Sequence, residues 1–234
     1  ATANIIFAMN NEVKTFETNS LNTIDLFKKF GKKKIVYTST TSIYGNADYY
    51  PTHEYAPHKC YNAYDTSKYI AELYLQQYNY TTLRLSNGYG ANQRPQSAFS
   101  GVIGKMIGKA LAGETIEIFG DGKSTRDYTY VDDVVQAIIM AIEQEPKKMA
   151  INIASGKETS ANDLAKHILV LLGKEYEHEI TKNVKYLEPR KIDFITRRCL
   201  QVECANYVLG WQPKTNLLDG LKKTIADFKV QMSL

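Results

Sequence analysis

The chain has 234 residues, of which 44% are hydrophobic and 23% charged, and its formal net charge is +4 at pH 7. This ordinary globular composition argues against a disordered protein and gives enough length for one sizeable core or two small ones. The lysines are scattered apart from residues 32–34, so we interpret that run as a solvated face and not as a nucleic-acid patch. The mild positive balance suits a phosphorylated small molecule as ligand.

The three cysteines form no Cys-x-x-Cys pair, and the four histidines show no metal-ligand spacing. We therefore expect reduced thiols, no metal site and a cytoplasmic location. The sequence contains no apolar run of membrane-spanning length and no basic-then-apolar leader. We accordingly expect no membrane partner.

The first predicted elements are a strand over residues 4–9 (NIIFAM), a helix over residues 19–30 and a strand over residues 35–39 (IVYTS). The helix follows from apolar residues at 21, 24, 27 and 30, and the strands follow from short apolar runs. Strand, helix and strand in this order form the parallel βαβ unit. An amphipathic helix within residues 61–75, a strand over 81–87 and a turn-rich loop over 88–96 come next.

The alternation continues with a helix over residues 101–112, a strand over 114–122 that ends in an Asp-Gly hairpin turn, and a helix over 131–145. A strand over 150–155 is followed by a helix with Ser160 as N-cap, Asp163 at capping-box spacing and Gly173 as its stop. The pattern predicts the α/β fold class. There is no internal repeat or Pro/Gly-rich linker, so any second domain should be interwoven with the first.

Tyr64 and Lys68 stand four residues apart near the start of a predicted helix, where side chains at i and i+4 are neighbours. Chance alone accounts for such a pair, because 17 Tyr and 23 Lys in 234 residues give about 1.7 Tyr-x-x-x-Lys matches in random order. Two matches occur. The other, Tyr55 and Lys59, has Pro57 between its members, which a helical turn does not accommodate. Only the surrounding sequence can show whether Tyr64 and Lys68 are functional.

Six segments in order supply that context: STTSIYG (39–45), the helix with Tyr64 and Lys68, LRLSNGYGANQRP (83–95), IFGDGKSTRDYTYVDDVV (118–135), EPRKIDF (188–194) and LGWQPKTNLLDGLKKTI (209–225). Together they resemble the extended short-chain dehydrogenase/reductase family, specifically its nucleotide-sugar epimerase and dehydratase branch. The resemblance covers residues 5–225. Six ordered motifs are far more specific than any single one.

The resemblance implies a Rossmann-like parallel sheet flanked by helices over residues 1–95 plus 126–155, and an interwoven substrate-binding subdomain over residues 96–125 plus 156–234. It implies NAD as cofactor, a nucleoside diphosphate sugar as substrate, with a UDP-sugar the commonest, and a homodimer. The implied catalytic residues are Tyr64, Lys68 and Thr40. The implied cofactor contacts are Ala8, Asn19, Ser39 and Ser86, together with Tyr64 and Lys68. The implied substrate contacts are Thr40, Thr41, Asn87, Val102, Arg126, Arg190 and Asp193.

Several of these contacts have structural alternatives. Arg126 could pair with Asp127 or Asp132, and Arg190 could pair with Asp193. Asn87 follows a strand, where asparagine commonly stabilises a turn.

The chemistry of this family requires a tyrosine that releases its proton readily. A tyrosine acts as a base near neutral pH only if its pKa of about 10 falls by ~3 units, which corresponds to about 4 kcal/mol of differential stabilisation. An ammonium one helical turn away favours the phenolate, so we expect Lys68 to lower the pKa of Tyr64. By resemblance, Thr40 positions the sugar hydroxyl, Tyr64 takes its proton, and hydride leaves the same carbon for NAD+.

Two departures from the family pattern bear on function. Related dehydratases and decarboxylases place Asp-Glu or Ser-Glu directly after the catalytic threonine, whereas this chain has Thr41 and Ser42. A C4 epimerase is therefore the better match, with a dehydratase or reductase as the alternative. The family's Gly-x-x-Gly-x-x-Gly cofactor loop is also missing, because residues 4–9 resemble its fourth strand. We expect a fragment of a longer protein, an omitted N-terminal stretch, or a non-catalytic nucleotide-sugar-binding protein that has lost dinucleotide binding.

Overall fold

A three-stranded parallel sheet organises the N-terminal half of the chain. Its strands are β1 (Ile35–Thr40), β2 (Tyr80–Leu85) and β6 (Met149–Ile153), in the order β1-β2-β6. The computed structural model describes residues 1–94, 100–146, 148–174, 182–190, 192 and 194–233. The predicted strands over residues 35–39 and 150–155 are confirmed, and the predicted strand over residues 81–87 begins at β2.

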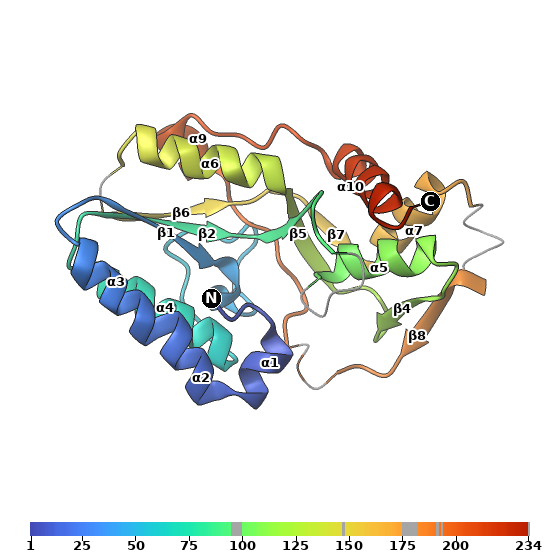
Figure 1. The fold of residues 1–234 in the computed structure, drawn as a ribbon, viewed down its shortest axis with the longest axis horizontal. Helices are drawn as coiled ribbons and strands as arrows, with labels where there is room; N and C mark the ends of the chain where they lie inside the picture. Colours follow the sequence, from blue (N-terminus) through green and yellow to red (C-terminus); the bar gives the residue numbers. More distant parts are fainter. Residues whose placement is uncertain (95–99, 147, 175–181, 191, 193, 234) are drawn as a thin grey trace.

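Helices cover both faces of this sheet (Figure 1). One face carries α3 (Asn22–Phe30) and α4 (Ala63–Leu75), which enclose a cluster that includes Phe27, Tyr37 and Leu75. The opposite face carries α6 (Val131–Glu143) and α9 (Glu203–Leu209). The predicted helices over residues 19–30, 61–75 and 131–145 correspond to α3, α4 and α6. A Rossmann-like layer of helix, parallel sheet and helix therefore forms, as the α/β prediction expected.

The N-terminal segment is helical, so the predicted strand over residues 4–9 is wrong. Helix α1 (Ile5–Asn10) is followed by α2 (Glu12–Phe16) and by a π-helical turn, η1 (Glu17–Leu21), that leads into α3. The Asn4 side chain accepts a hydrogen bond of 2.9 Å from the backbone N–H of Phe7 and so caps α1. A six-residue apolar run fits either a strand or a helix, and this cap favours the helix. The placement of these residues as the family's fourth strand is therefore also wrong.

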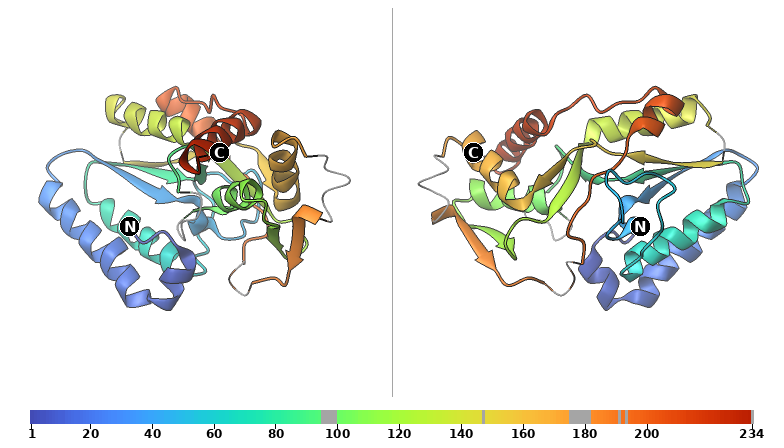
Figure 2. Two further views of the ribbon diagram at one scale, coloured as in Figure 1. Left: turned by 45° about the vertical axis from the view of Figure 1, so that its right-hand side comes forward. Right: turned by 180° about the vertical axis from the view of Figure 1, so that it is seen from behind.

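A second region gathers around the strands that follow β2. β3 (Asn87–Tyr89) pairs in parallel with β5 (Thr125–Tyr130), and β5 pairs antiparallel with β7 (Glu158–Ser160). β4 (Ile116–Phe119) pairs in parallel with β8 (Val184–Leu187). Figure 2 shows α5 (Val102–Leu111), α7 (Ala161–Leu171) and α10 (Leu217–Gln231) gathered at this end of the molecule. Their apolar faces share one core with β4 and β5.

The Asp-Gly turn after β4 does not form the predicted hairpin, because β4 pairs with β8 and not with β5. The turn instead packs on the start of α7, where Asn162 Nδ2 donates a hydrogen bond of 3.0 Å to the carbonyl of Asp121. The caps of α7 are as predicted: the Ser160 side chain accepts from the backbone N–H of Asp163, and Gly173 follows the helix with φ +76°.

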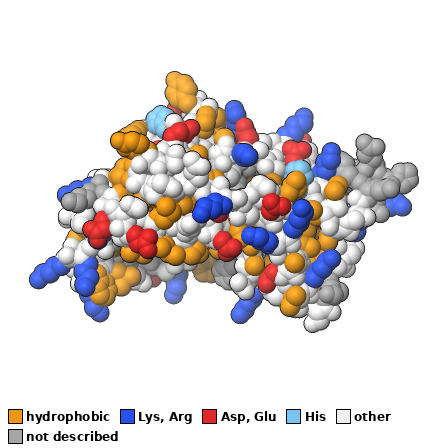
Figure 3. All heavy atoms as spheres, turned by 90° about the horizontal axis from the view of Figure 1, so that it is seen from above, with side chains coloured by type: hydrophobic (Ala, Val, Ile, Leu, Met, Phe, Trp, Pro, Cys, Tyr) orange, Lys and Arg blue, Asp and Glu red, His pale blue; other side chains and the backbone are white. Residues whose placement is uncertain are grey.

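Residues 203–211 return to the first sheet. Ala205, Leu209 and Trp211 pack in one cluster with Leu83 of β2 and Ile151 of β6. The chain therefore crosses between the two regions more often than the predicted domain boundaries imply, and the division itself stays a prediction. Figure 3 views the molecule from the side on which α6, α9 and α10 lie in Figure 1, and shows hydrophobic and charged side chains interspersed on this face.

Candidate active site

Thr40 and Tyr64 meet at the carboxyl end of β1. Thr40 is the last residue of β1 and caps the 3-10 turn η2 (Thr41–Tyr44), its Oγ1 accepting from the backbone N–H of Ser42 at 3.1 Å. Helix α4 begins beside this turn, capped by the Asn62 side chain, which accepts from the backbone N–H of Asp65 at 3.0 Å. Tyr64 lies in the first turn of α4, where its phenol interacts with the side chain of Thr40.

Burial raises the pKa of Tyr64 above its ordinary value of 10.0. The interaction with Thr40 lowers this pKa, the Asp65 carboxylate raises it, and the Arg198 guanidinium lowers it. The net direction is upward, because desolvation disfavours the phenolate more than these groups favour it. The described residues alone therefore do not make Tyr64 a base near neutral pH.

Lys68 lies one turn further along α4 and is directed toward β1. Its Nζ donates a hydrogen bond of 2.7 Å to the carbonyl of Thr38 and lies 4.3 Å from the centre of the Tyr37 ring. Burial lowers the pKa of Lys68 to about 8, and the Glu72 carboxylate acts in the opposite direction. The expected lowering of the pKa of Tyr64 by Lys68 stays a prediction.

Three buried polar atoms near the ends of β1 and β2 have no hydrogen-bond partner among the described residues. They are the hydroxyl oxygens of Ser39 and Thr41 and the Oδ1 atom of Asn87. Ser39 and Thr41 are 4% and 1% exposed. Buried polar groups in native proteins are nearly always paired, so each unpaired one needs an explanation, of which a bound polar ligand or water is one. All three belong to residues predicted as ligand contacts, and those contacts stay predictions.

The other predicted substrate contacts are spread over several places. Asn87 and Val102 line a hollow of about 30 Å³ beside Tyr128. Arg126 donates hydrogen bonds of 2.8 Å to the carbonyls of Thr125 and Ile195. Arg190 is exposed and stacks over the Phe119 ring at 4.3 Å. Asp193 lies outside the described residues.

The other predicted cofactor contacts are used in packing. Ala8 is fully buried in α1. The Asn19 side chain exchanges hydrogen bonds with the backbone of Thr2 at 2.6 and 3.1 Å and donates to the Ser67 hydroxyl at 3.1 Å. The hydroxyls of Ser86 and Thr129 lie 2.6 Å apart. Cofactor contacts of Ala8, Asn19 and Ser86 remain predictions.

Two buried charged residues that sequence reasoning missed contribute to the electrostatics of Tyr64. Asp65 and Arg198 are 1% and 9% exposed, and each alters the proton affinity of the tyrosine. Asp65 is the next residue to Tyr64 and could have been considered. Arg198 carries no motif signal, since it follows another arginine in an irregular segment.

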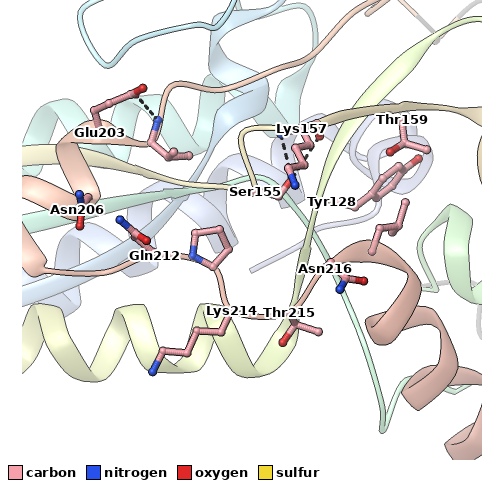
Figure 4. Close-up of a pocket in the computed structure, with 13 residues that line it drawn as sticks. Tyr128, Ser155, Lys157, Thr159, Glu203, Asn206, Gln212, Lys214, Thr215 and Asn216 are labelled. Atoms are coloured by element: carbon pink, nitrogen blue, oxygen red, sulfur yellow. Dashed lines mark hydrogen bonds between the residues drawn. The ribbon is translucent and has the colours of Figure 1, made fainter.

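A larger hollow than the one beside Tyr128 lies elsewhere. It has a volume of about 420 Å³ and is lined by none of the predicted site residues. Figure 4 shows Ser155 and Lys157 from the loop before β7, and Lys214, Thr215 and Asn216 from the segment that leads into α10. Size alone does not make this cavity the catalytic site, because Tyr64, Lys68 and Thr40 are not part of it.

The described residues contain no cluster of three or more His, Cys, Asp or Glu side chains that could hold a metal ion. None of the helices within the described ranges is both long and apolar enough to cross a membrane.

Comparison with known proteins identifies the family of the chain. Residues 1–154 match the model of the NAD dependent epimerase/dehydratase family. The chain belongs to this family. The matched region contains β1, α4 and β2, and thus Thr40, Tyr64 and Lys68 together.

Relatives of the chain are similar over most of its length. A Methanocaldococcus jannaschii protein, "Putative UDP-glucose 4-epimerase", is 35% identical over 238 residues, which is 96% of this chain and 73% of the relative. The UDP-glucose 4-epimerase of Mycolicibacterium smegmatis is 34% identical over 85% of this chain and 63% of its own length. The crystal structure of a Thermotoga maritima UDP-glucose 4-epimerase with UDP-glucose superposes with a TM-score of 0.91 at 32% identity, covering 99% of this chain and 76% of that one.

Proposed function

We propose that this protein is an NAD-dependent nucleotide-sugar 4-epimerase that acts on a UDP-sugar. The observation that carries the proposal is the meeting of Thr40, from the end of β1, and Tyr64, from the first turn of α4, with Lys68 one turn further on. The similarity to UDP-glucose 4-epimerases supports the substrate class. The chain spans between 63% and 76% of these relatives, so the activity is proposed for the complete protein.

Each residue at the end of β1 has a role in this proposal. Ser39 and Lys68 would hold the cofactor, since one offers an unpaired hydroxyl and the other a buried ammonium at the carboxyl end of β1. NAD+ supplies a hydride acceptor when bound. Thr40 orients the sugar hydroxyl toward Tyr64, and Tyr64 holds or releases the proton of that hydroxyl. Thr41 and Asn87 bind the sugar through their unpaired oxygens.

The two residues after Thr40 favour epimerisation over dehydration. Elimination of water needs a positioned acid, and this chain has Thr41 and Ser42 where related dehydratases have two carboxylic acids. The Ser42 hydroxyl lies 2.9 Å from Thr40 Oγ1, so it supports the threonine. Thr41 and Ser42 therefore fit a site that binds the sugar but does not eliminate water from it.

The test uses Tyr64→Phe, with Tyr55→Phe as its matched control. Tyr55 belongs to the second Tyr-x-x-x-Lys match but is 91% exposed. In the complete protein supplied with NAD+, we expect Tyr64→Phe to lower kcat for UDP-glucose and UDP-galactose interconversion by about 10²–10⁴-fold, as the loss of a general acid/base does. Its Kd for UDP-glucose, measured by calorimetry, should stay close to the wild-type value. Tyr55→Phe should change neither quantity.

Two results would contradict the proposal. Loss of UDP-glucose binding in Tyr64→Phe would reassign Tyr64 to the substrate pocket. A wild-type protein that binds UDP-glucose but shows no turnover with NAD+ would instead indicate a nucleotide-sugar-binding protein without catalysis.

We further propose a homodimer in the cytoplasm. Helices α3 and α4 expose apolar side chains on their outer surface, among them Leu26 at 55%, Phe30 at 49% and Leu73 at 44%. Apolar patches of this kind commonly mark protein interfaces. The three cysteines are free, which suits a reducing compartment. Sedimentation velocity should give a dimer, and a monomer at micromolar concentration would refute the interface.

A further inference from the structure

The larger hollow, of about 420 Å³, lies apart from the candidate active site. Its volume is within the range of small-molecule pockets, which is about 300–1,000 Å³. It is bounded by the loop between β6 and β7, by the start of α9 and by the segment that leads into α10. Figure 4 shows Ser155 and Lys157 on one side of this space and Lys214 and Thr215 on another. The larger hollow can therefore hold an organic molecule.

A buried carboxylate fixes the wall that carries Lys157. Asp127 is fully buried, and its Oδ1 accepts hydrogen bonds from the backbone N–H and the hydroxyl of Ser155 at 2.8 and 2.7 Å. Its Oδ2 accepts from the backbone N–H of Gly156 at 3.0 Å. The two residues that precede Lys157 are thus bonded to one buried side chain, and this fixes the backbone from which the lysine extends.

A second buried carboxylate, that of Asp133, fixes the wall that carries Lys214. Its two oxygens accept from the backbone N–H groups of Lys214 and Thr215 at 3.1 and 3.0 Å. The carbonyl of Asp133 accepts from Trp211 Nε1 at 2.9 Å, and both of these side chains are buried. Both lysine-bearing walls are therefore held in place by the fold itself, which reduces the ordering cost of binding a ligand.

The charged side chains of the larger hollow remain available, although the backbone around them is fixed. The ammonium groups of Lys157 and Lys214 are exposed and have no ion-pair or hydrogen-bond partner in the part of the chain that the structure describes. Glu203 carries the only negative charge among the described residues that line the larger hollow. Its Oε2 already accepts from the backbone N–H of Val202 at 3.0 Å. Two free cations against one bonded carboxylate favour an anionic ligand.

We propose that the larger hollow is a second binding site, which takes a small organic phosphate. Lys157 and Lys214 bind the phosphate group from two sides, because ammonium groups form strong charge-assisted hydrogen bonds with phosphate oxygens. The organic part contacts the side-chain amides of Asn206 and Gln212 and the ring of Pro213, all of which line the larger hollow. This binding site shares no residue with the proposed proton transfer, so the inference does not depend on the proposed epimerase activity.

NMR of methylated lysines tests this inference and reports on the larger hollow alone. In the complete protein, reductive methylation attaches ¹³C-methyl groups to the lysines and keeps their positive charge. The resonances of Lys157 and Lys214 are identified by their loss in Lys157→Met and Lys214→Met. The probes are inorganic phosphate, glucose 1-phosphate and UMP. We expect both resonances to shift with one common Kd, which should be lower for glucose 1-phosphate or UMP than for inorganic phosphate. The tighter of the two organic probes shows whether the organic part is a sugar or a nucleoside.

Each lysine variant also changes the binding that the other lysine reports. Lys214→Met should raise the Kd seen at the Lys157 resonance by about tenfold or more, as the loss of a charge-assisted hydrogen bond does. Lys157→Met should do the same at the Lys214 resonance. The matched control is Lys229→Met, because Lys229 is exposed on α10 but does not line the larger hollow. This control should leave the Kd unchanged.

Four results would overturn the inference. The first is that neither resonance shifts with any probe at about 10 mM, a concentration at which a millimolar Kd is readily detected. The second is a shift of only one of the two resonances, and the third is an equal Kd for all three probes. The fourth is a rise in Kd in Lys229→Met as large as that in Lys214→Met. A protein without epimerase activity would leave these dissociation constants unaffected, so the two proposals can fail separately.

Discussion

Arg84 and Glu72 form a buried ion pair that fixes α4 against β2, and its removal gives a sharp test of the fold around Tyr64. Both side chains are 5% exposed. Arg84 donates to the same Glu72 oxygen through Nε at 2.9 Å and through Nη2. Its Nη1 donates to the hydroxyl of Tyr44 at 2.8 Å and to the carbonyl of Glu54 at 2.7 Å. Arg84→Met therefore leaves a buried carboxylate and a buried carbonyl without partners.

The expected loss is about 3–5 kcal/mol in the free energy of unfolding, because one member of a buried pair remains uncompensated. This would be a large part of the stability of an ordinary domain. Glu72→Leu combined with Arg84→Met should cost much less than Arg84→Met alone, since no buried charge then remains. Urea denaturation followed by the fluorescence of Trp211, the single tryptophan, reports the difference, as Trp211 is 1% exposed.

The exposed pair of Arg197 and Glu158 provides the control for Arg84. Its side chains are 51% and 28% exposed, so Arg197→Met should cost less than about 1 kcal/mol. A cost below about 1 kcal/mol for Arg84→Met would refute the electrostatic reasoning. A double variant less stable than Arg84→Met would refute it as well, because the loss would then come from packing.

Two further predictions concern pH and backbone packing. Burial lowers the pKa of Lys68 to about 8 from its ordinary value of 10.5, so between these values the unfolded chain binds a proton that the folded chain does not. The stability of the wild type should therefore rise by about 2 kcal/mol relative to Lys68→Met between about pH 7.5 and pH 9.5; a constant difference in urea denaturation would contradict this. A Cβ on Gly220 would lie 2.1 Å from the hydroxyl oxygen of Tyr89, which is 3% exposed, whereas one on Gly88 meets nothing within 4 Å. Gly220→Ala should thus cost about 1–3 kcal/mol and Gly88→Ala much less, and equal thermal midpoints for the two variants would show that Tyr89 moves freely.

Helices with a long apolar stripe or a clear cap could be predicted from the sequence. The spacing in residues 19–30 and 131–145 corresponds to one buried helix face, and Ser160 with Asp163 forms the cap that its spacing indicates. Residues 4–9 could not be assigned in this way, because a short apolar run fits the two-residue period of a strand and the 3.6-residue period of a helix equally well. These residues form helix α1 because the Asn4 side chain caps its start and because it packs against α4. The β4 and β8 pair could not be predicted either, since strands distant in sequence are joined only by tertiary packing.

The candidate site, too, could be predicted only where the local sequence determines it. Thr40, Tyr64 and Lys68 could be identified because local spacing and ordered motifs place them near one strand end. The direction of the Lys68 ammonium depends on the carbonyl of Thr38, and the proton affinity of Tyr64 depends on burial. Arg198 is buried although it comes from an irregular segment far along the chain, and that segment carries no motif that could have indicated this.

One buried polar network anchors both α4 and the Arg198 segment. The hydroxyl of Tyr44 accepts from Arg84, which holds Glu72 on α4, and donates to Asn152 Oδ1 at 2.8 Å. Asn152 Nδ2 in turn donates to the carbonyls of Thr52 and Gln201 at 3.1 and 3.4 Å. The network therefore connects α4, through Glu72, to the backbone of Thr52 and Gln201 next to the bridge between Thr52 and Leu200.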